Sequence, residues 1–208
     1  MPKVSDEHRA ARRQQIVSAA MRCVAREGFH KTTMAHVISE SGLSAGAVYG
    51  YFKGKTDLIK AIAEGSAGGL AGALVAIADG PGTVTVPGAV RSLVSKIDEI
   101  AGQDDANVAR VALHAWSEAA RSNEVREVVR DNVALLHSGW VRVLRRAEAD
   151  GNLEPGGDHA AMARILVGLM PGFLVQGLLL GETDGPAYAD GFADLLARVP
   201  HQEPAVSS

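Results

Sequence analysis

Hydrophobic residues recur every three or four positions along almost the whole chain. This spacing places them on one face of an α-helix, whereas a strand would need them at every second position. Helical stripes of this kind cover residues 7–27, 57–78, 86–101, 104–120, 124–150, 158–180 and 188–199. We find no notable β-type alternation and no internal repeat. The pattern therefore predicts an all-α protein.

Two shorter stripes, at residues 34–38 and 48–52, predict a helix-turn-helix. Gly42 lies between them, and glycine tolerates the left-handed backbone that a tight turn requires. Ser44 is a good N-cap for the second short helix. Two helices joined by such a turn form a DNA-reading unit whose second helix lies in the major groove. A DNA-binding function is the first hypothesis.

The stretch from residue 33 to residue 58 resembles the DNA-binding signature of the TetR family of transcriptional regulators. The positions that match the family pattern are Thr33, Gly42, Ser44, Gly46, Tyr49, Tyr51, Phe52, Lys55 and Leu58. The chain departs from the pattern at Ile38 and Ser41, where alanine is usual, and at Ala45, which is often lysine. The resemblance implies an N-terminal three-helix DNA-binding domain and a helical C-terminal domain for ligand binding and dimerisation.

The predicted contacts with DNA come from both helices of this unit. In the family, residues at the positions of Thr33 and Lys55 meet phosphates, and a free helix N-terminus is an anion site. The second helix offers small, uncharged side chains and tyrosines to the groove. Tyr51 is open to two interpretations, packing or contact. The predicted DNA-binding residues are Thr33, Ser44, Ala45, Gly46, Ala47, Tyr49, Gly50, Tyr51 and Lys55.

The same turn also allows a hypothesis from another class of protein, an enzyme. Residues 42–46 also satisfy the G-x-S-x-G pattern of a serine hydrolase, with Ser44 as the nucleophile. That motif requires a strand before the turn, and the preceding residues have helical spacing. A constitutive DNA-binding protein without ligand response is the third hypothesis. We expect a regulator and not an enzyme.

The distribution of charge supports a division into two domains. Residues 1–60 hold 10 Lys/Arg against 5 Asp/Glu, and the remainder holds 11 against 19, so a basic module precedes an acidic body. We place the DNA-binding domain at residues 1–56 and the ligand-binding and dimerisation domain at residues 57–208. The single cysteine, Cys23, forms no intrachain disulfide. No signal peptide or bilayer-spanning run is expected, which indicates a cytoplasmic protein.

The C-terminal part supplies candidates for a ligand cavity and a dimer interface. Residues 165–180 are apolar all round, so they should be buried on every side, and Pro171 should kink their helix. The resemblance implies an inducer cavity, for which the candidates are Leu113, Trp116, Leu136, His137, Trp140, Met170, Phe173 and Leu174. It also implies a homodimer, with interface candidates Ile165, Leu169, Leu178, Phe192 and Leu196. His114 and Glu118 have spacing that would allow a metal, but no further ligands accompany them, and we expect neither metal nor cofactor.

The resemblance implies a repressor that an inducer releases from operator DNA, and the candidate cavity residues suit a small, mostly apolar inducer. One more feature bears on that switch. Gly65, Gly68, Gly69 and Gly72 lie within the helix that joins the two domains, where glycine is unfavourable. We interpret this helix as a hinge; the alternative is that close packing requires the small residues.

Overall fold

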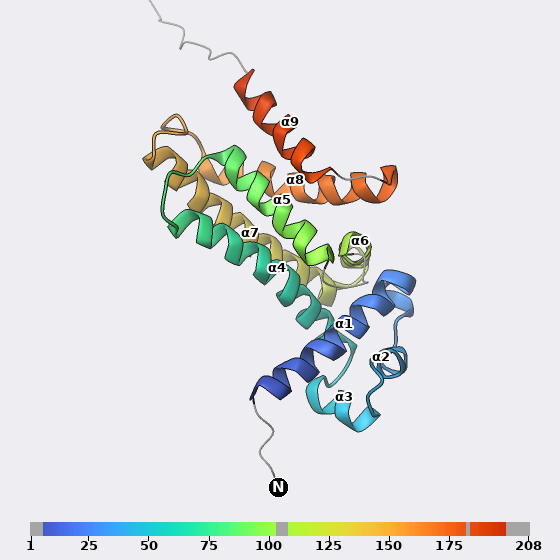
Figure 1. Ribbon diagram of the computed structural model, residues 1–208. Helices are drawn as coiled ribbons and strands as arrows, with labels where there is room; N and C mark the ends of the chain where they lie inside the picture. Colours follow the sequence, from blue (N-terminus) through green and yellow to red (C-terminus); the bar gives the residue numbers. More distant parts are fainter. Residues whose placement is uncertain (1–5, 103–107, 182–183, 199–208) are drawn as a thin grey trace, which may run out of the picture.

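The computed structural model describes residues 6–102, 108–181 and 184–198, and within these ranges every regular element is an α-helix (Figure 1). The all-α prediction is confirmed. The helices are α1 (Asp6–Lys31), α2 (Met34–Ser41), α3 (Ala45–Tyr51), α4 (Lys55–Asp79), α5 (Val86–Gly102), α6 (Val108–Ala119), α7 (Asn123–Ala149), α8 (His159–Leu180) and α9 (Gly185–Ala197). Residues 104–107 of one predicted helix lie outside the described residues.

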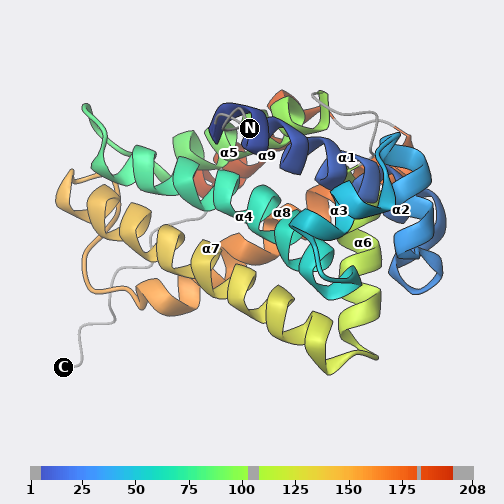
Figure 2. The ribbon, with the colours of Figure 1, turned by 90° about the horizontal axis from the view of Figure 1, so that it is seen from below.

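The helices form an elongated molecule with α1–α3 at one end and α9 at the other (Figures 1 and 2). Helices α4 and α7 lie side by side along the body, α8 packs on α7, and α9 packs on α5. Helix α4 is continuous from the start of this body to the three-helix end, so no flexible linker separates the two parts.

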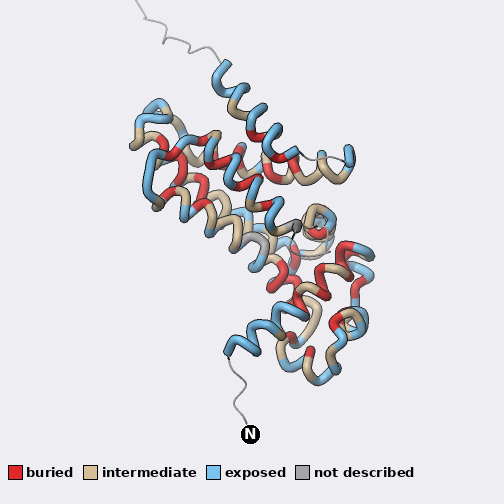
Figure 3. The backbone as a smooth tube through the Cα atoms, viewed as in Figure 1, coloured by how far each residue is buried: buried red, intermediate tan, exposed pale blue. Residues whose placement is uncertain are grey.

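Two clusters of buried side chains hold these helices together. Figure 3 marks the buried residues along the backbone, both at the three-helix end and in the body. The first is the core of α1–α3, and it extends into α4, α6 and α7 through Ile62, Val111 and Val125. The second fills the body around Leu74 and Trp140, both of which are completely buried. The core of the DNA-binding end therefore continues past the proposed boundary at residue 56 into the body.

Helix α1 bends sharply at Gly28. The helical stripe over residues 7–27 predicted that the helix ends at Gly28, but after this residue, with φ 78° and ψ 165°, a last helical turn follows to Lys31. This backbone region is essentially restricted to glycine. The carbonyl of Gly28 accepts hydrogen bonds from both the backbone N–H and the hydroxyl of Thr32, at 3.2 and 2.8 Å. The kink directs the chain into α2.

Helix α8 continues as one helix through Pro171 to Leu180, as predicted. It differs from the prediction because it is not buried on all sides. Ala163, Leu166, Met170 and Phe173 face the core, whereas Ile165, Leu179 and Leu180 are 68%, 75% and 73% exposed. The apolar character of residues 165–180 therefore leaves a hydrophobic face open on the single chain.

Two of the helices, α4 and α8, are long and apolar enough to cross a membrane by length and composition alone. The apolar run at residues 165–180, taken alone, had indicated that no helix would reach that length. This is weak evidence for a membrane protein, because core helices of soluble proteins satisfy the same criterion. In this structure both helices pack against α7.

The end of α4 far from α1–α3 is firmly held. Arg142 forms an ion pair with Asp79 at 2.6 Å. Arg146 donates to the carbonyls of Ala78 and Gly82, at 3.1 and 2.7 Å, and pairs with Asp150 at 2.9 Å. Because these contacts fix the last turn of α4 to α7, any movement of α4 must arise nearer its beginning.

The glycines of α4 lie in that earlier part. A Cβ atom added at Gly65, Gly68 or Gly72 would have no described atom of another residue within 4 Å, apart from its chain neighbours and its own helix backbone. At Gly69 it would lie 3.7 Å from Cδ1 of Ile100, which is an ordinary contact. Close packing therefore does not explain these four glycines.

Candidate DNA-binding surface and ligand cavity

The turn between α2 and α3 has the geometry of a helix-turn-helix. Gly42 takes the left-handed conformation with φ 67° and ψ 14°, and its N–H donates to the carbonyl of Ser39. Ser44 is extended, and its hydroxyl accepts from the N–H of Ala47 at 3.2 Å. Val37 and Val48, which are 1% and 0% exposed, join the two helices to the core.

Ser41 shows how the chain accommodates one departure from the family pattern. The residue is buried, and its hydroxyl donates to the carbonyl of Ile38 at 3.0 Å and accepts from the N–H of Leu43 at 3.3 Å. Gln15 of α1 also donates to the Ser41 carbonyl at 2.8 Å. A buried hydroxyl without partners would be destabilising, but the Ser41 hydroxyl forms both of its hydrogen bonds with backbone groups close by in the sequence.

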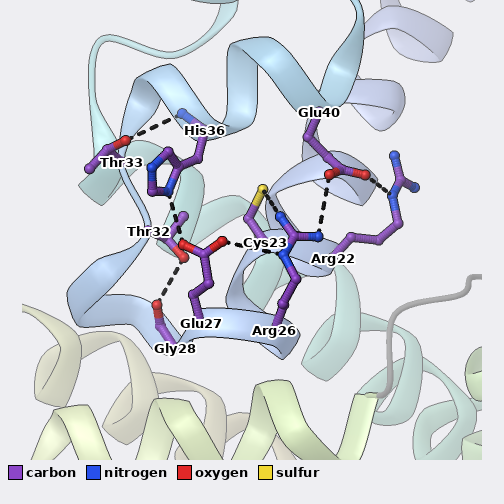
Figure 4. A network of polar contacts seen from close by, with 9 residues as sticks. All are labelled: Arg22, Cys23, Arg26, Glu27, Gly28, Thr32, Thr33, His36 and Glu40. Carbon is purple, nitrogen blue, oxygen red and sulfur yellow. Dashed lines mark hydrogen bonds and ion pairs between the residues drawn. The ribbon is translucent and has the colours of Figure 1, made fainter.

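A polar network ties α2 to α1 (Figure 4). Glu40 accepts from Arg22 at 2.8 Å and from Arg26 at 3.4 Å. Glu27 accepts from Arg26 at 3.3 Å and lies 3.0 Å from Nδ1 of His36. These contacts fix α2 against α1, and so they set the position of the turn that carries α3.

The charges of this network shift the pKa values of its members. The hydrogen bond from Arg22 lowers the pKa of Glu40, and the hydrogen bond to Glu27 raises the pKa of Arg26. Burial raises the pKa of the Cys23 thiol, which is fully enclosed. A buried thiol with a raised pKa carries little thiolate, so Cys23 has the properties of a core residue.

The residues predicted to contact DNA lie together at the α2–α3 end of the molecule. Tyr49 is 50% exposed, Ala47 is half-buried, and Tyr51 packs partly against the core. The other members of α3 in the predicted set, and the two capping residues, are exposed: Thr33, Ser44, Ala45, Gly46 and Gly50. None of these exposed positions carries a charged side chain. Contact with DNA remains a prediction.

The two predicted phosphate ligands have structural partners as well. The Thr33 hydroxyl accepts from the N–H of His36 at 3.3 Å and so caps α2. Lys55, at the first position of α4, donates to the carbonyl of His30 at 3.3 Å. An ammonium group has three donors, so this bond leaves Lys55 able to meet a phosphate.

The G-x-S-x-G pattern has a different structural context from that of a hydrolase. The residues before Gly42 form helix α2 and not a strand, and Ser44 is the N-cap of α3. The nucleophile motif requires a strand-turn-helix. The local structure therefore gives Ser44 a capping role.

A cavity of about 170 Å³ lies between α4, α6, α7 and α8. Its lining is almost wholly hydrophobic, and none of the described lining residues is ionisable. It consists of Phe29, Ile59, Ile62, Ala63, Leu70, Ile97, Val108, Val111, Ala112, Ala115, Trp116, Val125, Val128, Val129, Asn132, Val133, Leu136, Val167, Met170, Pro171 and Leu174. A concave, mostly apolar site with few polar groups is typical of a small-molecule site.

Four of the eight predicted ligand-binding residues line this cavity: Trp116, Leu136, Met170 and Leu174. The other four lie elsewhere. Leu113 is 39% exposed, and Trp140 and Phe173 are in the body core, where the Phe173 ring packs against Tyr188. His137 lies 3.0 Å from the carbonyl of Ala160. Helical spacing identified the right helices but did not distinguish the cavity face from its neighbours.

Most of the lining residues were not in the predicted set, and three of those missed are Phe29, Ile59 and Ile62. All three line the cavity, and all three also line a small void of about 10 Å³ beneath α2, beside Thr33 and Val37. They belong to the core of the DNA-binding end. One wall of the cavity is therefore made of the same side chains that support α2.

Only part of the predicted dimer set lies on the open apolar face of α8 and α9. Ile165 and Leu196 are 68% and 45% exposed, Leu178 is half-buried, and Leu169 and Phe192 pack partly on the body core. Three exposed leucines that the prediction omitted extend this face: Leu179, Leu180 and Leu195.

Two bacterial HTH-type regulators resemble the chain over most of its length. The uncharacterised HTH-type regulator YfiR of Bacillus subtilis is 27% identical over 181 residues, which is 87% of each chain. The regulator BetI of Agrobacterium fabrum is 28% identical over 207 residues, covering 94% of this chain and 91% of BetI. Among solved structures, a SmeT–triclosan complex has a TM-score of 0.74 at 22% identity and covers 95% of this chain and 99% of SmeT.

Family-level comparison covers both parts of the molecule. The family described as bacterial regulatory proteins, tetR family, matches residues 16–62, which include the helix-turn-helix. The family described as BetI-type transcriptional repressor, C-terminal, matches residues 89–199, which is more than half of the chain. The chain therefore belongs to the TetR family of bacterial transcriptional regulators, which are not enzymes.

Proposed function

We propose that this protein is a cytoplasmic, homodimeric repressor that a small apolar ligand releases from operator DNA. The observation that carries the proposal is the shared wall of the cavity. Phe29, Ile59 and Ile62 touch both the cavity and the void under α2, so an occupied cavity presses directly on the support of the DNA-reading unit. The SmeT structure, a neighbour in fold, is a complex with triclosan, which supports a ligand in this chain as well.

The DNA-binding surface acts through position and shape. Thr33 and Lys55 contact phosphates and set the register, while Ala47 and Tyr49 face the groove and read the sequence. Alanine methyls fit against thymine methyls. The set contains no Arg or Lys on α3 that would grip guanine, so contacts of this chain favour A·T-containing half-sites.

The open apolar face of α8 and α9 supports a homodimer. Ile165, Leu179 and Leu180 on α8 and Leu195 on α9 are more than half exposed, which is unfavourable for a chain that remains single. A Cβ added at Gly168, in the same helix, would meet no described atom, so a second α8 has room to approach closely. Pairing two chains gives two α3 helices for two half-sites.

The switch is a shift between two arrangements of α1–α3 relative to the body. One arrangement fits the operator, and a ligand that prefers the other weakens DNA binding by its difference in affinity for the two. The glycine-rich middle of α4 permits the change, because the far end of α4 is tied to α7 through Arg142 and Arg146.

The test begins with selection of bound sequences from random duplexes by the purified full chain. A palindromic site that binds with at least about a thousandfold preference over bulk DNA is expected. Ala47→Glu, which places a negative charge on the groove face of α3, should abolish the preference, whereas Leu135→Glu on the exposed side of α7 should not. Failure to select any common sequence would contradict the proposal.

A further inference from the structure

The cavity has one polar side chain in the middle of an apolar helix face. Residues Val125, Val128, Val129, Val133 and Leu136 of α7 line the cavity at helical spacing, and Asn132 stands among them. Asparagine is unfavourable within a helix, and an amide that faces an apolar space has fewer bonds to water than one on the surface. Neither packing nor helix propensity explains an amide at this position.

The Asn132 amide is half-buried and has no hydrogen-bond partner among the described residues. Its neighbours on the lining are aliphatic, so a partner is not available from the wall beside it. An asparagine amide both donates and accepts. It is therefore free to bond to a polar group of a molecule in the cavity.

Two other polar atoms belong to lining residues. Trp116 has an indole N–H, which only donates. Pro171 has no N–H, so it cannot donate to the carbonyl of Val167 four residues earlier, and both residues line the cavity. The site thus offers neutral donors and acceptors, and the described lining has no charge to pair with an ammonium or a carboxylate.

The size of the cavity limits the ligand further. At about 170 Å³ it is close to an engineered apolar cavity of about 150 Å³ that binds benzene. One aromatic ring, or an aliphatic body of that size, fills it. Burial of an unpaired charge there would be strongly unfavourable.

We infer that the cavity selects an uncharged ligand of about one ring that carries a single hydrogen-bonding group, and that Asn132 recognises this group. The inference rests on the proposed function, since it names the ligand class of the regulatory cavity. Asn132 sets specificity within a site whose affinity comes from burial of the ring.

The experiment uses four probes that share one ring: toluene, benzyl alcohol, benzoate and benzylammonium. Binding to the full chain is titrated by NMR at pH 7 in the absence of DNA. We expect benzyl alcohol to bind at least as tightly as toluene, and both ions to bind at least about 100-fold more weakly than the alcohol. Tighter binding of either ion than of the alcohol would overturn the ligand class.

Variants locate the recognition. Asn132→Leu should weaken the binding of benzyl alcohol about tenfold relative to that of toluene, because the hydroxyl then loses its hydrogen-bond partner in an apolar site. Asn132→Asp should strengthen the binding of benzylammonium at least about tenfold, because the new carboxylate pairs with the ammonium charge. Asn123→Leu, the same change on the exposed first turn of α7, should leave all four affinities unchanged. An unchanged ratio of alcohol to toluene in Asn132→Leu would overturn the role of Asn132.

Failure of this inference and failure of the proposed function are distinguishable. Operator affinity of the same samples is measured without any probe, so it reports on the repressor alone. If none of the four probes binds while the operator is bound normally, the ligand class is wrong and the DNA-binding function stands. If the probes bind as expected but no operator exists, the cavity is a ligand site in a protein that does not repress.

Discussion

The imidazole of His114 lies against the α-carbon of Gly28: a Cβ atom at Gly28 would come within 3.2 Å of its Nδ1. This contact joins α6 to the kink of α1, and Gly28 also has the positive φ of 78° that other residues avoid. Gly28→Ala therefore combines backbone strain with a tight contact that His114 must relieve by a small shift, and it should lower the free energy of unfolding by about 1–3 kcal/mol.

Gly42→Ala is the control for this change. Gly42 also has a positive φ, but a Cβ there would meet no described atom within 4 Å, so only the backbone term applies. We expect Gly42→Ala to lower the free energy of unfolding by about 1 kcal/mol. Urea-induced unfolding measures this free energy for both variants. A larger loss for Gly42→Ala than for Gly28→Ala would show that the contact with His114 is unimportant.

A second prediction separates positioning from sequence reading on the DNA surface. Lys55→Ala should weaken binding about equally on all duplexes and reduce the slope of log affinity against log salt by about one unit. Tyr49→Ala should reduce affinity for the operator more than for bulk DNA. Fluorescence anisotropy at several salt concentrations measures both. A changed sequence preference with an unchanged salt slope for Lys55→Ala would refute its assignment to phosphate.

The glycine-rich part of α4 leads to a third prediction. Gly68→Ala combined with Gly69→Ala should stabilise the protein by about 1–2 kcal/mol, because both sites have room for Cβ and alanine favours the helix. Operator affinity should stay near normal, and release by ligand should weaken. The readout is the ratio of operator affinities with and without a bound cavity ligand.

Gly191→Ala in α9 is the matched change for that experiment, since Gly191 also has open space around its Cβ position. It should stabilise the chain and leave the ratio unchanged. Equal ratios for the α4 double variant and the unmodified protein would exclude a hinge at this place.

Dimerisation supplies a fourth prediction. Leu179→Asp on the open face of α8 should shift the protein from twice the chain mass to a single chain mass in sedimentation at micromolar concentration. Leu135→Asp is the comparison, because Leu135 is also exposed, at 51%, but lies on α7. A single chain mass for the unmodified protein, with tight binding to a palindrome, would contradict the interface.

A fifth prediction concerns acid. The hydrogen bond from Arg22 holds the pKa of Glu40 below its ordinary 4.5, so the folded state binds this proton less readily than the unfolded state. The stabilisation is complete above pH 4.5 and is lost as the pH falls through the lowered pKa. Thermal unfolding measured between pH 7 and pH 3 should show a smaller loss of stability on acidification for Glu40→Gln than for the unmodified chain.

Glu64→Gln provides the control in the acid series. Glu64 pairs with Arg13 at 3.6 Å, and its side chain is 69% exposed, so the ion pair is screened by solvent. Its removal should leave the pH dependence unchanged. If both variants behaved alike, the α1–α2 network would not be the source of the acid sensitivity.

The sequence was sufficient for the helices and the turn because their signals are local. Gly42 and Ser44 take the conformations that their residue types favour, and the helical spacing of Val37 marks the buried face of α2. The end of the first helix was predicted at Gly28, but the further helical turn to Lys31 was not, because the hydrogen bonds of Thr32 that support this turn follow the break.

The cavity was harder to predict because its walls come from distant parts of the chain. Trp140 and Trp116 both follow the helical spacing of apolar residues, but Trp140 is fully buried in the body core and Trp116 lines the cavity. Phe29 and Ile59 were not among the predicted lining residues, since helical spacing cannot show that they face the cavity. Only the packing of α1 and α4 against α6 and α7 brings them there.

The wall that Phe29, Ile59 and Ile62 provide to both spaces has a consequence for the operator itself. Energetic coupling between two sites is reciprocal, so DNA that holds these side chains in one arrangement must oppose the ligand by the same factor with which the ligand opposes DNA. For typical couplings that factor is about 5 to 150. The operator therefore acts as an antagonist of the ligand, and protein bound to DNA responds at a higher ligand concentration than protein free in solution.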